Sequence, residues 1–99
     1  MRVELSTNAD RTLFEIPERL EPYGLAYCER VVEALNSALL LLERRPEIGR
    51  PIGTDGLRLW SVSDLPYVIP YRLDRERDVL VVIDFHFTRR PLPERWPED

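Results

Sequence analysis

The most regular hydrophobic pattern in the chain lies between Leu25 and Leu42. Apolar residues recur there at steps of three and four positions, which is the spacing of one face of an α-helix. They are Leu25, Cys28, Val31, Val32, Leu35, Leu39 and Leu42. The pattern predicts a long amphipathic helix whose apolar side belongs to the core. Pro46 follows shortly afterwards and should stop the helix, because proline lacks an N–H and clashes with the preceding turn.

The segment before this helix changes its period once. Residues 2–7 alternate polar and apolar side chains, which predicts a half-buried strand. Apolar residues at looser helical spacing then predict a first helix over about residues 9–20. Pro17 lies inside that helix and should end, kink or restart it. Pro22 opens a turn and suits the first position of the next helix.

Strand patterns dominate after Pro46. A turn-rich connector over residues 45–53 leads to three strand candidates, Leu57–Val62, Tyr67–Leu73 and Val79–Phe87, separated by loops short enough for hairpins. The fold class expected is therefore α+β with the order β-α-α-β-β-β: a helical hairpin packed on one face of a small, largely antiparallel sheet. Residues 1–91 form the expected domain, and residues 92–99 an irregular C-terminal tail.

Counting every second residue predicts which sheet face each side chain occupies. The last strand has one wholly apolar parity, expected to pack on the helices: Val79, Val81, Ile83, Phe85 and Phe87. If every strand turns its apolar parity to the helices, a polar group gathers on the open face: Arg58, Trp60, Arg72, Asp84 and His86. We expect a partner-binding surface there, extended by Arg89 and Arg90. A bulge at Pro70, which cannot donate a ladder hydrogen bond, would shift the count by one.

Composition narrows the class of protein. The 99 residues are 43% hydrophobic and 32% charged, typical of one soluble domain, and no stretch is long enough to span a bilayer. We therefore expect a cytoplasmic chain with no membrane partner. The net charge of −4 argues against a protein that coats nucleic acid, although all 14 basic residues are arginine. The single Cys28 cannot form an internal disulfide and is expected to be buried, and no motif predicts a metal or cofactor.

Three segments carry a resemblance to a known family. Residues 45–51 (RPEIGRP) leave the helical hairpin with a Pro-x-hydrophobic-Gly pattern, residues 65–73 (LPYVIPYRL) are similar to the strand pattern PYVIFYRV, and residues 81–91 end in a His-x-x-Arg closure. Together they resemble the ParE/RelE toxin family over roughly residues 2–91. Pro70, Pro17 and Trp96 depart from the family pattern. The resemblance implies a toxin neutralised by a small ParD-like or RelB-like antitoxin, whose acidic side chains would meet Arg58, Arg72, Arg89 and Arg90.

The resemblance leaves two activities open. ParE-like members inhibit DNA gyrase by protein–protein binding, whereas RelE-like members cleave mRNA on the ribosome. Cleavage by 2′-OH attack needs a base, an acid and cations beside the phosphate, and the candidates would be His86, Arg72, Arg58 and Arg89. Lysine is absent, Phe87 stands where a tyrosine would follow His86, and Asp84 would offset the local charge.

We therefore expect a gyrase inhibitor without catalytic residues of its own, and direct nucleic-acid binding only in the ribonuclease alternative. A third possibility is an inactive toxin-like binding module. Structural roles also remain open for the same side chains: Arg72 and Asp84 could pair across adjacent strands, and Trp60 could pack beneath the tail.

Overall fold

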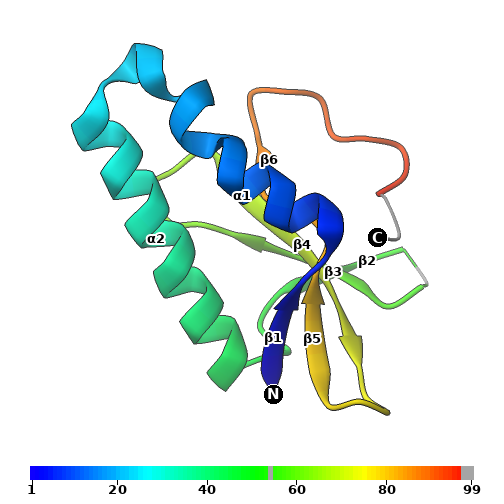
Figure 1. Cartoon of the computed structure of the whole chain (residues 1–99). Helices are drawn as coiled ribbons and strands as arrows, with labels where there is room; N and C mark the ends of the chain where they lie inside the picture. The colour runs from blue at the N-terminus through cyan, green and yellow to red at the C-terminus, as the bar shows by residue number, and fades with distance from the viewer. Residues whose placement is uncertain (54, 97–99) are drawn as a thin grey trace.

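The structure, a computed structural model, describes residues 1–53 and 55–96 (Figure 1). Its helices are α1 (Thr7–Arg19), the short 3-10 helix η1 (Glu21–Tyr23) and α2 (Leu25–Arg44). Its strands are β1 (Arg2–Leu5), β2 (Arg50–Ile52), β3 (Leu57–Ser61), β4 (Tyr67–Asp74), β5 (Val79–Val82) and β6 (His86–Phe87). Two helices pack against a mixed, mostly antiparallel sheet, which confirms the α+β class and the order of the main elements.

Helix α1 begins directly after β1 because Ser6 caps it. The Ser6 hydroxyl accepts a hydrogen bond from the Ala9 backbone N–H (3.0 Å) and donates one to the Ile83 carbonyl (2.9 Å). The helix continues past Pro17 for only two residues, ending at Arg19. Pro22 lies in η1 and not at the start of α2, so that expectation was wrong; Gly24, with φ of +94°, separates the two helices.

The core lies between the two helices and the sheet. Cys28, Val31, Leu35, Ala38 and Leu42 are the buried residues of α2, as its apolar spacing predicted for most of them. Leu25 is the exception, since 74% of it is exposed. It occupies the first turn of α2, which lies beside η1 and beyond the strands (Figure 1).

The strand order is β1-β5-β4-β3-β2, with β6 paired to β4 beyond the end of β5. Strand β1 runs parallel to β5, and the other pairs are antiparallel. Strand β2 formed within the segment that we expected to be only a connector. It lies at the sheet edge, where Pro51 is tolerated because its missing N–H is not needed on the outer side.

The strand expected over residues 79–87 is broken by a bulge opposite Pro70. Val82 pairs with Tyr71 and His86 pairs with Val68, so residues 83–85 stand opposite only Ile69 and Pro70. Because of the extra residue, even-numbered residues face the helices before the bulge and odd-numbered residues face them after it. Leu80 and Val82 join the core before the bulge, whereas Phe85 joins it after the bulge. The prediction that Val79, Val81 and Ile83 face the helices was therefore wrong.

Strand β3 also turns the other way from the prediction. Arg58 is paired with Tyr71 and Trp60 with Ile69, so both share the helix-facing side of the sheet. The apolar residues Leu57 and Leu59 occupy the open side, where each is only 6% exposed. Val79 and Ile83 are buried with the same parity, so the sheet carries buried apolar side chains on both faces.

Candidate functional site

The residues expected to form one partner-binding face do not lie together. Arg58 and Trp60 belong to the helix-facing side of the sheet. Arg72 has the opposite parity, paired with Leu57 and Val81, and His86 shares that side through its pairing with Val68. The predicted shared face of Arg58, Trp60, Arg72 and His86 was therefore wrong, because its premise of one apolar parity per strand fails in β3.

Arg58 forms hydrogen bonds that hold the fold together. Its guanidinium donates hydrogen bonds to the backbone carbonyls of Glu47 (3.0 Å) and Gly49 (2.9 Å). These contacts tie β3 to the connector that leaves α2. Glu47 is held from the other side by Arg75, whose hydrogen bond (2.8 Å) and charge lower the pKa of that carboxyl below its usual value.

Arg72 is engaged on the other side of the sheet. It donates to the carbonyl of Asp55 (3.2 Å) and forms an ion pair with the Asp55 carboxylate (3.3 Å). The cross-strand pair with Asp84 that the sequence suggested does not form. The Asp84 carboxylate instead accepts a hydrogen bond from the backbone N–H of Phe85 (2.8 Å), inside the bulge.

His86 is covered by the C-terminal segment. Its Nε2 lies 3.1 Å from the carbonyl oxygen of Arg90, and the Trp96 ring meets the imidazole edge to face at 5.3 Å between centroids. The Arg89 guanidinium lies over the Phe87 ring at 5.8 Å. The aromatic neighbour of His86 is thus Trp96 and not Trp60. Residues 91–96 form no helix or strand, and residues 97–99 of the expected tail lie outside the described residues.

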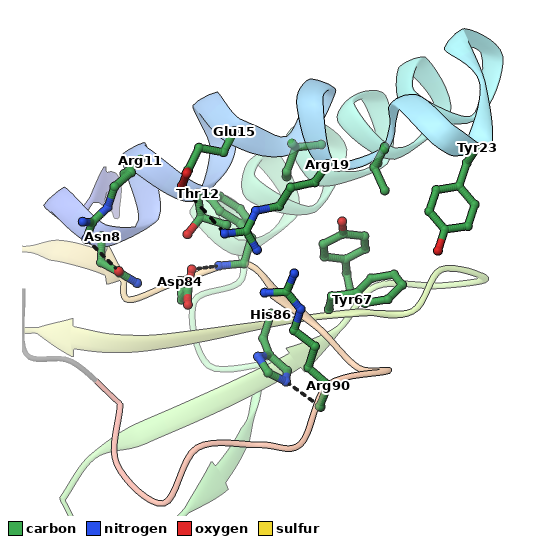
Figure 2. Close-up of a pocket in the computed structure, with 14 residues that line it drawn as sticks. Asn8, Arg11, Thr12, Glu15, Arg19, Tyr23, Tyr67, Asp84, His86 and Arg90 are labelled. Atoms are coloured by element: carbon green, nitrogen blue, oxygen red, sulfur yellow. Dashed lines mark hydrogen bonds and ion pairs between the residues drawn. The ribbon is translucent and has the colours of Figure 1, made fainter.

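A pocket of about 590 Å³ opens between α1 and the segment that includes the bulge and β6 (Figure 2). Ile16, Leu20, Phe85 and Phe87 supply apolar walls. The polar lining consists of Asn8, Arg11, Thr12, Glu15, Arg19, Tyr23, Tyr67, Asp84, His86 and Arg90. Of the residues expected on the partner-binding face, only Asp84, His86 and Arg90 line this pocket.

The α1 side of the pocket was missed in the sequence. A signal was present, because Asn8, Thr12, Glu15 and Arg19 follow one another at steps of four, three and four. Such spacing places them on one face of a helix. Without knowledge of the bulge, however, nothing indicated that this polar stripe faces His86 and Arg90.

The electrostatics of the pocket are mixed. Arg11, Arg19 and Arg90 bring positive charge, whereas Glu15 and Asp84 bring negative charge. Arg19 and Glu15 form a long ion pair (4.0 Å) between exposed side chains. Burial raises the pKa of the Tyr67 phenol, and the charges of Arg19 and Arg90 partly oppose that rise.

Other kinds of site find no support in the described part of the chain. No group of three or more histidine, cysteine or acidic side chains there could hold a metal ion. No helix among those residues is long and apolar enough to cross a membrane. Cys28 is buried and unpaired, as its place in the apolar stripe of α2 predicted.

Comparisons with known proteins agree with one another. Residues 3–90 match the profile of the family described as the ParE toxin of the type II toxin–antitoxin system parDE. The candidate toxin Y4kP of Sinorhizobium fredii is 31% identical over 97 residues, which cover 98% of this chain and 94% of that protein.

Two solved structures share the fold. A chain of the chromosomal ParDE toxin–antitoxin system of P. aeruginosa superposes with a TM-score of 0.74 at 17% identity, over 88% of this chain and 95% of that one. A chain of the RelBE2 toxin–antitoxin complex of Mycobacterium tuberculosis superposes with a TM-score of 0.64 at 22% identity, over 87% and 95%.

Proposed function

Because this chain belongs to the ParE toxin family of type II toxin–antitoxin systems, we propose that it arrests growth by binding DNA gyrase and that a small ParD-like or RelB-like antitoxin neutralises it. Since DNA gyrase is a cytoplasmic enzyme, the proposed site of action of this chain is the cytoplasm. The observation that carries the choice of target is the dispersal of the side chains that RNA cleavage would need.

Cleavage of an RNA strand requires an acid, a base and cations within hydrogen-bond reach of one phosphate. Arg58 and Arg72 point to opposite sides of the sheet, and both already serve as donors to backbone carbonyls. His86 contacts the carbonyl of Arg90 and the ring of Trp96. This arrangement supports a toxin that acts by protein–protein contact, because the candidates for catalysis are neither gathered nor free.

The proposal is tested by inducible expression of the chain in bacteria. We expect growth arrest on induction and recovery when the small open reading frame beside the gene is co-expressed. His86→Ala should arrest growth as strongly as the native chain, because the imidazole takes no part in the proposed contact chemistry. Arg95→Gln, at an exposed residue near the C-terminus, serves as the control.

The contrary outcomes are distinct from one another. Loss of arrest in a folded His86→Ala chain that still binds antitoxin would replace gyrase inhibition by the ribonuclease alternative. Soluble native chain that never arrests growth would overturn both toxin activities and identify an inactive binding module.

A further inference from the structure

Tyr67 presents a polar atom that no described residue satisfies. The residue is only 5% exposed, and its ring packs edge on against Phe87 at 5.4 Å between centroids. Its hydroxyl makes no hydrogen bond within the described residues, whereas the hydroxyl of Tyr71 in the same strand makes two. No fully enclosed side-chain oxygen or nitrogen among those residues lacks a partner, so the Tyr67 oxygen is reached from the pocket that it lines.

The orientation of the Tyr67 ring determines where its hydroxyl oxygen points. Figure 2 shows the Tyr67 ring rising from β4 with its hydroxyl directed toward α1. A buried polar group normally has a hydrogen-bond partner. In the free chain water can serve, but the position is equally open to an acceptor brought by a bound molecule.

Two guanidinium groups line the same pocket as Tyr67 (Figure 2). Arg19 comes from the end of α1 and Arg90 from the segment after β6. The ion pair of Arg19 with Glu15 spans 4.0 Å between side chains that are 47% and 39% exposed, so it constrains Arg19 weakly. None of the ion pairs found among the described residues involves Arg90. Both side chains therefore have hydrogen-bond donors to offer.

The balance of charge indicates the kind of ligand. Three arginines and two carboxylates line the pocket, which leaves one net positive charge when His86 is neutral. A singly charged carboxylate matches that balance, whereas Glu15 and Asp84 would oppose the second charge of a phosphate. The apolar walls of Ile16, Leu20, Phe85 and Phe87 further favour a peptide in which an acidic residue lies beside apolar ones.

We propose that this pocket binds a carboxylate side chain of the cognate antitoxin, held by the Arg19 and Arg90 guanidinium groups and the Tyr67 hydroxyl. The inference rests on the proposed function in one respect, that an antitoxin is the neutralising partner. It adds the site and the chemistry of the contact. Hydrogen bonds that involve a charged group are the strong ones at interfaces.

The test measures binding of the full-length antitoxin to the full chain by isothermal titration calorimetry. We expect Arg90→Gln and Tyr67→Phe each to raise Kd by about tenfold or more, because each removes a hydrogen bond to a charged group. Arg95→Gln, at an exposed residue that does not line the pocket, should change Kd by less than about threefold, since a surface substitution away from special contacts usually shifts a free energy by under about 0.5 kcal/mol. Equal affinity of Arg90→Gln and native chain would overturn the proposal.

A structural role for Tyr67 is excluded by a second measurement. The thermal midpoint of free Tyr67→Phe chain should match that of the native chain, because the lost hydroxyl has no partner in the described part of the fold. A fall in both midpoint and affinity would assign the residue to folding and overturn its place in the site.

The antitoxin carboxylate is found by changing each acidic residue of the antitoxin to its amide. One such change should weaken binding to the native chain and have little further effect on Arg90→Gln, which is the signature of a direct pair. If no acidic residue of the antitoxin is coupled to Arg90, the proposed carboxylate site is wrong and the gyrase proposal is unaffected. If an acidic residue is coupled to Arg90 but the chain does not arrest growth, the site stands and the gyrase proposal is wrong. A chain that binds no antitoxin would overturn both the proposed partner and the proposed site.

Discussion

Removing one oxygen atom from Tyr71 should weaken the whole fold. Tyr71 is completely buried, and its hydroxyl donates to the carbonyl of Pro46 (2.7 Å) and accepts from the backbone N–H of Gly49 (2.8 Å). These bonds fasten the connector after α2 to the centre of the sheet. Gly49 allows the close approach, because a side-chain Cβ at that position would collide with the phenol.

The magnitude follows from the two bonds. Each contributes about 1 kcal/mol, and stranding a buried donor or acceptor costs about 1–3 kcal/mol. We expect Tyr71→Phe to lower the free energy of unfolding by about 2–4 kcal/mol. For a domain of about 100 residues that corresponds to a fall in Tm of roughly 10–25 °C.

Urea denaturation at neutral pH measures this change as a lower midpoint with an unchanged slope. Tyr67→Phe is the matched control, since the same atom is removed from the same strand but makes no hydrogen bond within the described residues. It should alter the free energy of unfolding by less than about 0.5 kcal/mol. Equal losses for the two variants would refute the assignment of stability to the Tyr71 bonds.

Further predictions concern Arg58, Arg72, Trp96 and the two buried tyrosines. Arg58→Ala should cost about 1–3 kcal/mol in urea denaturation, because the carbonyls of Glu47 and Gly49 lose their charged donor. Arg72→Ala should cost less than about 1 kcal/mol, because its pair with Asp55 is exposed to solvent. Trp96→Ala should speed the reaction of His86, the sole histidine, with diethyl pyrocarbonate, and an unchanged rate would contradict the packing of Trp96 on the imidazole. Burial raises the pKa of Tyr67 and Tyr71 above the ordinary value of 10.0. The tyrosines of the unfolded chain therefore ionise at a lower pH than those of the folded chain, and the free energy of unfolding should fall as pH rises above 10.0. A free energy of unfolding that stays constant across this range would refute the shift.

The sequence predicted the helices and the order of the elements well. The apolar residues of α2 recur at steps of three and four, so they had to lie on one face of the helix and pack on the core. Pro46 follows the end of the helix, as expected. Propensity and period are local properties, so they can be read from neighbouring residues. The end of α1 was also constrained by a single residue, Pro17.

The faces of the sheet were harder to predict because they depend on pairing between distant strands. The bulge opposite Pro70 moved Leu80 and Val82 to the helix side. The possibility of a shift at Pro70 was visible, but its direction was not. In β3 the apolar residues Leu57 and Leu59 are buried on the open side, whereas Arg58 and Trp60 on the helix side are only partly buried, so an apolar parity could not identify the core face.

The same limit applies to the candidate site. His86 and Arg90, which were expected on a partner-binding face, line a pocket whose opposite wall on α1 comes from about 70 residues earlier in the chain, a separation that no local pattern spans. Arg58 and Arg72 looked like binding residues because exposed arginines often are. Their carbonyl partners, Glu47, Gly49 and Asp55, became apparent only with the loops in place.

We propose that this toxin acts on gyrase by binding and not by cutting RNA. The most direct test adds purified chain to a gyrase supercoiling reaction and, in parallel, to ribosomes that carry mRNA. We expect supercoiling to stop as the chain approaches the enzyme concentration, to resume when antitoxin is added, and the mRNA to remain intact. Undiminished supercoiling together with cleaved mRNA would contradict gyrase inhibition and identify a ribonuclease.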